Sequence, residues 1–503
     1  MKKKFVFISA LFTLSTLSAY SQDGSPDSSF GNNGTIQQDI SGDLRDFSFT
    51  IAEQHDGKLV VAGGVENSNS EIVPTVVRFT ENGDLDTSFG NNGVVSRYFG
   101  DDQDYFVHIG VQDNGGIIAV GSMGPFGNTE VILNRFLPDG TLDTSFGSNG
   151  DLIPFGNSEL NSAFTSLDGN SFLVASPVSD GGSTQIEMKK YLPEGTLDTS
   201  FGTNGSITID NGEESDAIYG IEIMSSGVIV IAARVQTNGN FFYSLLRYLP
   251  NGARDTTFGT NGVVILPEFQ NFGVKSFAVF ENGDIVVLQS RFFNNPERIE
   301  TRLTRFFVNG TYDSSFGGGQ GFIDPGISTL SPRTILIQPN QRILLYGELT
   351  DFFEGGGNTF IRRYHTNGGG DGSFQITTVL NQEYFAHKML LQNDGKVVCM
   401  GLSPWYNGDE DFVLERYNNS PLGVPEFEIR DVLAFPNPLQ NKVTISYDFI
   451  QGRSIPYQIS DISGKLLIQG KLSGDRTILE LSALQSGMYF LNLPGQTIRL
   501  LRE

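Results

Sequence analysis

Short stretches in which apolar and polar residues alternate recur along most of the chain, each followed by a polar tight turn and an apolar run. Ile109 and Val111, for example, precede NGGIIAVG at 114–121, and the same arrangement surrounds DGKLVVAG at 56–63. A period of two places one face of a strand on a core. Asp-Gly or Asn-Gly between apolar runs is typical of hairpins with type I′ turns. The pattern predicts an inner strand, a tight turn and a second strand in each unit.

Two sequence signatures recur with these hairpins and define a repeat. The first reads GDLDTSFGNNG at 83–93, and the second is a basic residue followed by an aromatic one, as in Arg78-Phe79. Each signature occurs seven times at nearly regular intervals along the chain, which indicates a repeat architecture. The phenylalanines of the first signature are Phe30, Phe89, Phe146, Phe201, Phe258, Phe316 and Phe374. With a short outer strand such as residues 93–98, each repeat is predicted to contain four strands.

The two ends of the repeat array complete each other. The array begins with DSSFGNNGTIQQD, which is the end of a repeat, and it stops after Arg416 and Tyr417, where that piece is missing. We therefore expect residues 34–40 to supply the outer strand of the last unit, whose other strands come from about residues 384–417. A shared last unit favours a closed ring over a linear solenoid, because closure leaves no unpaired sheet edges.

The predicted fold class is all-β. We expect a seven-bladed β-propeller at residues 22–419, closed by its N-terminal strand, then a linker at 420–430 and a small immunoglobulin-like β-sandwich at 431–503. Helix is expected to be scarce, since the chain holds 60 glycines and 40 phenylalanines and only 18% charged residues.

The repeated phrase suits a structural role at the turn between the third and outer strands. Asp86 can accept backbone N–H bonds, Phe89 can fill the space between blades, and Gly90 and Gly93 allow positive φ. A calcium loop is the alternative, but Asp84 is replaced by Thr or Ala in later copies. Copies two to five closely resemble the delta-sixty repeat of bacterial β-propeller proteins. This resemblance covers about residues 27–419 and implies the propeller fold without an activity.

The C-terminal segment carries a second set of motifs on short alternating strands. FPNP at 435–438, DISGK at 461–465 and SGMYFL at 486–491 resemble the type A sorting domain of type IX secretion cargo in Bacteroidetes. The resemblance implies that the export machinery of the outer membrane reads this module, and that the cargo is released or fixed at the cell surface. The motif residues are Pro436, Asn437, Pro438, Asp461, Gly464, Gly487 and Tyr489.

The N-terminus predicts export as well. Lys2, Lys3 and Lys4 precede an apolar run from Phe5 to Leu17, and small residues follow at the positions that a signal peptidase reads. We expect residues 1–21 to be a signal peptide cleaved before Gln22. The run is too short to span a bilayer, and we expect no transmembrane segment elsewhere. The predicted location is therefore secreted or at the outer-membrane surface, reached through the periplasm.

Charge and cysteine content exclude several functional classes. A formal net charge of −24 argues against nucleic acid or anionic membrane as a partner. Cys399 is the single cysteine, which excludes a disulfide framework and a cysteine-cluster zinc site, and we expect it to be buried. No His pair has metal-ligand spacing, and no catalytic motif occurs. We therefore predict no catalytic residue, no bound metal and no cofactor, with Ca²⁺ as the open alternative.

Two groups of loop residues are candidates for binding. Trp405 and Tyr406, in SPWYNGDED, are the preferred ligand-binding residues because aromatic faces flanked by Asn and Asp suit sugars or peptides. We expect other loop aromatics, such as Phe241-Phe242 and Phe292-Phe293, to pack under their own loops. Asp101, Asp102 and Asp104 lie in an acidic loop that enters an inner strand, as do Asp39, Asp43 and Asp46, and such carboxylates could hold Ca²⁺ or attract a cationic ligand.

Three functional hypotheses remain open. The preferred one is a non-enzymatic propeller that binds an extracellular glycan, peptide or protein through one loop-bearing face, because its inner strands look uniform and mostly small or apolar. The second is a glycosidase or lyase that uses carboxylates at the mouth of the ring. The third is a structural spacer. Type IX secretion machinery is a predicted partner in all three.

Overall fold

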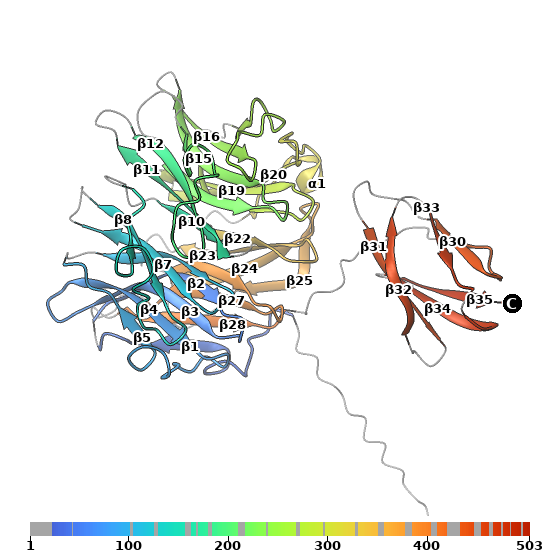
Figure 1. The fold of residues 1–503 in the computed structure, drawn as a ribbon, viewed down its shortest axis with the longest axis horizontal. Helices are drawn as coiled ribbons and strands as arrows, with labels where there is room; N and C mark the ends of the chain where they lie inside the picture. The colour runs from blue at the N-terminus through green and yellow to red at the C-terminus, as the bar shows by residue number, and fades with distance from the viewer. Residues whose placement is uncertain are drawn as a thin grey trace, which may run out of the picture.

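Residues 35–417 of the computed structural model form seven four-stranded antiparallel sheets, counted over the described residues (Figure 1). The described residues are 23–502 except 43, 101–103, 125–128, 156–161, 167–169, 180–183, 210–216, 238–239, 268–271, 295–296, 327–329, 351–356, 378–384, 404–409, 420–432, 447–453, 462–465, 474–475, 483 and 494–495. The predicted signal peptide (residues 1–21) and the predicted linker (residues 420–430) lie outside them.

Successive strands of one repeat are neighbours in one sheet. Sheet 1 is β2 (Asp46–Glu53), β3 (Leu59–Glu66), β4 (Ile72–Phe79) and β5 (Val94–Ser96). Sheet 2 is β6 (Tyr105–Val111), β7 (Ile117–Met123), β8 (Glu130–Phe136) and β9 (Asp151–Leu152). Sheet 3 is β10 (Ala163–Ser166), β11 (Phe172–Ser179), β12 (Thr184–Tyr191) and β13 (Ser206–Ile209). Sheet 4 is β14 (Ala217–Ile223), β15 (Ile229–Thr237), β16 (Asn240–Tyr248) and β17 (Val263–Ile265).

The later sheets follow the same order until the last one. Sheet 5 is β18 (Gly273–Val279), β19 (Ile285–Asn294), β20 (Glu297–Phe306) and β21 (Phe322–Ile323), with the short α1 (Phe316–Gly319) before β21. Sheet 6 is β22 (Leu330–Ile337), β23 (Ile343–Thr350), β24 (Gly357–Tyr364) and β25 (Gly370–Thr377). Sheet 7 joins β26 (Phe385–Leu391), β27 (Val397–Leu402) and β28 (Phe412–Tyr417) to β1 (Thr35–Gln38).

The N-terminal strand pairs with the end of the array, as the incomplete terminal repeats predict. β1 runs antiparallel to β28, with Thr35 opposite Glu415 and Gln38 opposite Phe412. The inner strands, which are the first strands of each repeat, contact one another in chain order, and β26 contacts β2. Each successive pair of sheets shares a hydrophobic cluster, and sheets 7 and 1 share one that includes Phe30, Val61 and Met400. Cys399 is buried, as predicted.

The hairpin turns differ from the predicted type. In the first hairpin the Gly57 N–H donates to the Gln54 carbonyl (2.9 Å) and the Gln54 N–H donates to the Lys58 carbonyl (2.8 Å). Gly57 has a φ of 81°, but Asp56 is not among the described residues with positive φ. This is a type I turn followed by a glycine bulge, whereas a type I′ turn needs two residues with positive φ. The type I′ prediction is therefore wrong, although the hairpins are present.

The two repeated signatures meet in one contact, which we name the Arg–Asp–Phe staple. In sheet 1 it consists of Arg78, Asp86 and Phe89. Arg78 Nε donates to Asp86 Oδ2 at 2.8 Å, and the guanidinium carbon lies 4.4 Å from the centroid of the Phe89 ring. Asp86 Oδ1 accepts hydrogen bonds from the N–H and the hydroxyl of Ser88 at 3.1 and 2.6 Å.

The staple also joins each sheet to the next one. Arg78 Nη1 donates to the Pro138 carbonyl at 2.5 Å, and the Gly90 N–H donates to the Asp139 carbonyl at 2.8 Å; both carbonyls belong to the following repeat. The Arg–Asp pair recurs as Arg135–Asp143, Arg247–Asp255, Arg305–Asp313, Arg363–Asp371 and Arg416–Asp27, and Lys190–Asp198 replaces it in sheet 3. The last arginine pair links residues from the two ends of the array.

Seven further strands form two sheets with a shared core at the C-terminus. One sheet has the order β29 (Leu433–Phe435), β30 (Lys442–Ser446), β33 (Arg476–Glu480), and the other has β32 (Leu466–Ser473), β31 (Ser454–Asp461), β34 (Gly487–Leu493), β35 (Gln496–Arg502). Val443, Ile459 and Leu491 are core residues drawn from both sheets. The two sheets agree with the small β-sandwich predicted for residues 431–503. In the described residues no helix is long and apolar enough to cross a membrane.

We expect Asp86→Ala to destabilise the repeat array, because it leaves the Arg78 guanidinium buried without its carboxylate. The two side chains are only 5% and 9% exposed, and removing one member of such a pair costs about 3 kcal/mol or more. Chemical denaturation followed by circular dichroism measures the loss. Asp84→Thr is the matched control, since Thr stands at this position in copies three, four and six and should be nearly neutral. Equal effects of the two substitutions would contradict the role of the staple.

Candidate functional site

Most residues predicted from the sequence to bind a ligand cannot be placed. Trp405, Tyr406, Asp101 and Asp102 lie outside the described residues, as does Asp43. Asp104 is described and is buried, with 1% of its surface exposed. Asp46, at the start of the first inner strand, is also buried, and its N–H donates to the Glu410 carbonyl at 2.7 Å. The prediction of carboxylates lining an open mouth is thus wrong for Asp104 and Asp46, because both lie where an inner strand begins between packed sheets.

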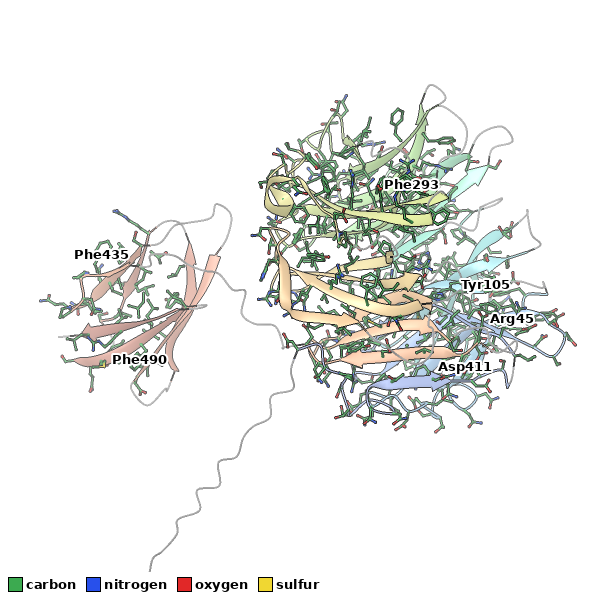
Figure 2. All side chains as sticks on the ribbon, turned by 180° about the vertical axis from the view of Figure 1, so that it is seen from behind. Arg45, Tyr105, Phe293, Asp411, Phe435 and Phe490 are labelled. Carbon is green, nitrogen blue, oxygen red and sulfur yellow. The ribbon has the colours of Figure 1, made fainter. Side chains whose placement is uncertain are left out.

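The paired phenylalanines are only partly covered, in contrast to expectation. Phe241 and Phe292 are 49% and 52% exposed and lie on β16 and β19. Phe293, labelled in Figure 2, is half-buried. The guanidinium carbon atoms of Arg291 and Arg298 lie 4.1 Å and 3.7 Å from its ring centroid. The expectation that all of these rings pack under their loops is therefore wrong for Phe241 and Phe292.

The inner strands are mostly small or apolar, but they share an irregularity that the sequence did not indicate. Six of the seven inner strands shift register against their second strand at an equivalent position, where one extra residue is inserted. Such β-bulges re-aim a side chain and are frequent beside functional sites. The inserted residues are Phe49, Val107, Tyr219, Lys275, Arg333 and His387.

Charged and imidazole side chains gather on the inner strands, at or near these bulges. We name His108, Glu222, Lys275, Arg333, His387 and Lys388 the inner-strand cluster. The side chains of Glu222, Lys275, Arg333 and Lys388 are exposed to solvent. Their pKa values nevertheless respond to one another across different sheets: the charge of Glu222 on β14 acts on Lys388 on β26, and that of Arg333 on β22 acts on Lys275 on β18. Glu222 and Lys388 thus interact electrostatically, as do Arg333 and Lys275, and all four residues contact solvent.

Surrounding protein shifts the pKa of both the acid and the lysines. Burial raises the pKa of Glu222 to about 7, although the Lys388 charge opposes this shift. Burial lowers the pKa of Lys388, which Glu222 partly offsets, and burial together with Arg333 lowers the pKa of Lys275. These side chains contact solvent, but the surrounding protein still removes part of the water that would stabilise their charged forms.

Both histidines of the cluster are neutral near pH 7. Burial lowers the pKa of His108 and of His387 to about 4 in each case, despite a hydrogen bond to a backbone carbonyl. His108 Nε2 lies 2.8 Å from the Ser162 carbonyl oxygen in sheet 3, and His387 Nδ1 contacts the Ser48 carbonyl oxygen in sheet 1. The His387 ring stacks on Phe49 with centroids 5.9 Å apart. Each imidazole therefore links its inner strand to the neighbouring sheet. Its neutral ring is also available for contact with a ligand.

Two of the three cations have no carboxylate partner. Arg333 Nη2 lies 2.5 Å from Glu348 Oε1, and Glu348 Oε2 accepts the Ala386 N–H at 2.9 Å. Among the described residues no carboxylate lies within 4.0 Å of the Lys275 or the Lys388 ammonium nitrogen. A lysine desolvated by protein without a counter-ion is costly, which makes it a candidate for binding an anion.

The arrangement was missed at the sequence level because a bulge shifts side chains by one position. Counted back from the turn, Lys275, Arg333 and His387 stand at the same place as Phe49 and Tyr219. An alignment of the repeats on the turn would have shown charged residues in this column. If no bulge is assumed, the alternation of side chains along a strand wrongly places Lys275, Arg333 and His387 on the packed face.

The sorting residues tie the FPNP segment to the last strand. Asn437 Nδ2 donates to the Arg499 carbonyl at 2.7 Å, and Asn437 Oδ1 accepts the Leu501 N–H at 2.9 Å. Pro436 and Pro438 follow cis peptide bonds on either side of it. Tyr489 pairs with Asp461 between β34 and β31, and its hydroxyl donates to the Gln485 carbonyl at 2.7 Å. Gly487 pairs with Arg502, and Gly464 lies outside the described residues.

Two family models match parts of the chain. Residues 433–501 match the secretion system C-terminal sorting domain. Residues 54–89, 112–146 and 225–258 match a β-propeller domain of unknown function, DUF5122. No curated protein matches the chain.

Several solved structures overlap with the chain at low identity. PorZ, a surface component of the type IX secretion system of Porphyromonas gingivalis, is 11% identical with a TM-score of 0.33, over 90% of this chain and 74% of that one. The polysaccharide lyase Uly1 is 12% identical with a TM-score of 0.42, over 81% and 94%. The β-propeller domain of the Trilobed protease from Pyrococcus furiosus is 10% identical with a TM-score of 0.37, over 79% and 95%.

The sorting domain indicates export to the cell surface or secretion, and the delta-sixty resemblance is consistent with the propeller family. The chain therefore carries DUF5122 β-propeller repeats followed by a type IX secretion system C-terminal sorting domain.

Proposed function

We propose that this protein is a closed seven-bladed β-propeller, exported by type IX secretion, that binds an acidic extracellular glycan at the inner-strand cluster. The seven sheets are its blades, residues 22–419 form the propeller and residues 431–503 the sorting domain. Closure is supported by the β1–β28 pairing, by the Arg416–Asp27 staple and by the contact of β26 with β2. Cleavage of residues 1–21 and an origin in Bacteroidetes are parts of the same proposal.

The observation that carries the proposal is the solvent exposure of Lys275 and Lys388 on inner strands, with no carboxylate of the described residues within 4.0 Å of either ammonium nitrogen. Arg333 lies close enough to Lys275 to lower its pKa. An anionic group would form charge-assisted hydrogen bonds with both ammonium groups, and at Lys388 it would compete with the charge of Glu222. Phe49 and Tyr219 stand at the bulge position in other sheets, so aromatic faces accompany the cations. A sugar acid offers both an apolar ring face and a carboxylate or sulfate, and it fits this combination.

The overall acidity of the chain does not oppose such a ligand. The net charge is −24, but charges farther apart than about 8 Å are largely screened at physiological ionic strength. The inner-strand cluster contains three cations and Glu222, and Glu348 pairs with Arg333. Selectivity for an acidic glycan therefore depends on direct contacts with the charged side chains of the cluster and not on long-range attraction by the whole protein.

A lyase or glycosidase is the second candidate, and one observation favours it. Glu222, whose pKa is raised to about 7, faces Lys388, whose pKa is lowered, and the neutral His108 stands nearby. Groups with pKa values moved toward neutrality are suited to general acid–base catalysis. The loop residues Trp405 and Tyr406 remain the candidates for a further contact with the glycan.

We expect the chain without residues 1–21 to bind chondroitin sulfate or polygalacturonate and not dextran, because only the acidic polymers supply anions to the lysines. Replacing both Lys275 and Lys388 by Gln should weaken binding at least tenfold, which isothermal calorimetry in EDTA would measure. Lys442→Gln, an exposed lysine on β30, is the control and should bind as the wild type does.

Unchanged affinity in the double variant, with retained circular dichroism, would remove the cluster as the binding site. Loss of binding in Trp405→Ala alone would move the site to the loop face. Stronger binding of poly-glutamate than of the glycans would indicate an acidic peptide ligand. Release of unsaturated sugars or reducing ends from the glycan, abolished in Glu222→Gln, would establish the enzymatic candidate instead.

Affinity for an acidic glycan should fall as pH rises from about 6 to 8. Glu222 has a raised pKa of about 7, so it loses its proton in this window and adds a negative charge beside Lys388. His108 and His387, whose pKa values burial lowers to about 4, are already neutral in this window. One added charge at this range costs roughly 1 kcal/mol, or about fivefold in affinity. Glu222→Gln should bind equally well at both pH values, and a wild-type slope in this variant would contradict the assignment.

Deletion of residues 433–503 should leave a folded propeller that is retained inside the cell envelope, because the sorting signal is lost. Fractionation of cells that express tagged chains measures this directly. The control is a chain with Asp84→Thr and an intact C-terminus, which should reach the surface or the medium. Efficient release of the truncated chain would refute the sorting role.

A further inference from the structure

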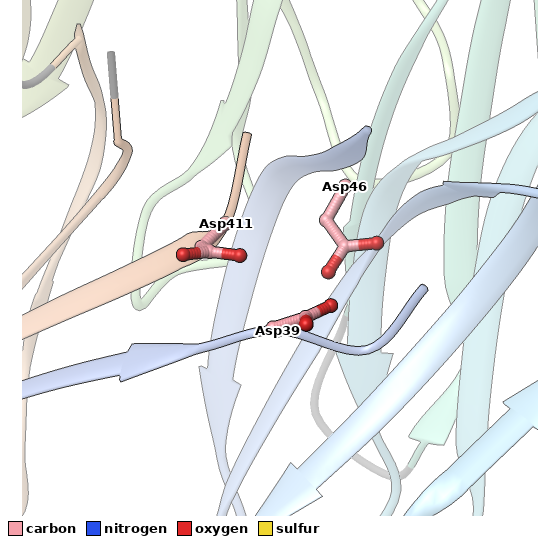
Figure 3. A group of neighbouring side chains, drawn as sticks. All are labelled: Asp39, Asp46 and Asp411. Atoms are coloured by element: carbon pink, nitrogen blue, oxygen red, sulfur yellow. The ribbon is translucent and has the colours of Figure 1, made fainter. Parts of the chain in front are cut away.

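Three carboxylates meet where the two ends of the repeat array come together. Asp39 follows β1, Asp46 begins β2 and Asp411 precedes β28. One oxygen from each residue lies within 4.8 Å of the others, and Figure 3 shows the three carboxyl groups turned toward one another. Asp46 and Asp411 are buried, with 0% and 6% of their surfaces exposed, whereas Asp39 is exposed.

Hydrogen-bond donors hold one oxygen of each carboxylate in place. The Ile40 N–H donates to Asp46 Oδ2, the Gly42 N–H to Asp39 Oδ1 and the Gln37 amide to Asp411 Oδ2, each at 2.6 Å. Donors of this kind orient carboxylates around a metal ion. The three groups are therefore fixed by local backbone and by one side chain of β1.

The second oxygen of each buried carboxylate lacks a partner. Asp46 Oδ1 and Asp411 Oδ1 are inaccessible to solvent and accept no hydrogen bond, and the buried Ser41 hydroxyl is in the same state. Burial raises the pKa of Asp46 to about 7, although the Ile40 N–H and Ser41 oppose this shift. Buried carboxylate oxygens without partners are costly, and native proteins satisfy nearly all such groups.

We propose that Asp39, Asp46 and Asp411 bind one Ca²⁺ ion, which fastens the N-terminal segment to β28. The 4.8 Å limit on their separation is about twice a Ca–O distance of 2.3–2.6 Å, so one ion can contact all three. The Ser41 hydroxyl and water molecules can complete its coordination. An all-oxygen set favours a hard cation, and Mg²⁺, with bonds of about 2.0–2.1 Å and strict octahedral geometry, suits fixed ligands at this spacing poorly.

The ion would strengthen contacts that already cross between the two ends. Gln37 on β1 bonds to Asp411, and the Asp46 N–H bonds to the carbonyl of Glu410. The facing charged groups are Glu410 itself and Arg45, which pairs with Glu66 at 2.8 Å rather than with the three aspartates. No cation of the described residues forms an ion pair with Asp39, Asp46 or Asp411, so a metal ion would supply the missing positive charge.

Thermal unfolding of the chain without residues 1–21 tests the site in EDTA and in millimolar CaCl₂. Ca²⁺ should raise the melting temperature of the wild type and of the control Asp84→Asn by several degrees, but that of Asp39→Asn hardly at all. Asn keeps the acceptor for the Gly42 N–H and removes repulsion against Asp46. Asp39→Asn should therefore be more stable than the wild type in EDTA and less stable in Ca²⁺.

Calorimetric titration with CaCl₂ should show one site fewer in Asp39→Asn and in Asp411→Asn than in the wild type. MgCl₂ should bind at least tenfold more weakly. A Ca²⁺-dependent melting shift of equal size in the wild type and Asp39→Asn would overturn the proposal, as would equal stoichiometry. Glycan binding measured in EDTA does not depend on this site, so failure of one proposal leaves the other intact.

Discussion

The buried ion pair between the arginine that ends the third strand and the aspartate of the next phrase is the contact on which the array depends. One guanidinium group binds the aspartate, covers the phenylalanine of the phrase and reaches a carbonyl of the following repeat. Arginine can do this because its nitrogen donors form a rigid planar fork, which lysine lacks. In sheet 3, where Lys190 stands instead, a groove of about 350 Å³ lies beside Lys190 and Pro250, the proline equivalent to those that accept the arginine bond elsewhere.

Because the staples do not involve the inner strands, the residues of these strands can differ between repeats. The staples and the hydrophobic clusters between sheets are built from the second, third and outer strands together with the apolar face of the inner ones. Lys275 and Arg333 are exposed at the bulge position, whereas Tyr219 packs against the hydrophobic cluster between sheets 4 and 5 and His387 stacks on Phe49. The repeat can therefore keep its phrase unchanged while this position carries Phe, Val, Tyr, Lys, Arg or His. Variation at one column of an otherwise regular repeat is what a binding site on such a scaffold requires.

The number of repeats, the strand order and the pairing of β1 with the last repeat were predictable because they follow from spacing, periodicity and the incomplete terminal phrases. The turn type was not, since Gly57 alone needs positive φ and Asp-Gly is compatible with both turns. The inner-strand cluster was missed because a bulge changes which residues share a face. The burial of Asp46 and Asp104 was missed because it depends on packing between sheets, which periodicity within one strand does not report.

The meeting point of the two ends differs from the other sheet boundaries in one physical respect. The Arg416–Asp27 pair joins residues 389 positions apart, whereas the Arg78–Asp86 pair spans eight. Contacts between distant residues require closure of a long loop before they contribute, so this boundary should form last and open first. Its local geometry is otherwise the same as elsewhere, with the same staple and a comparable hydrophobic cluster. An additional contact would therefore stabilise the repeat array most at this boundary, and the three aspartates lie there.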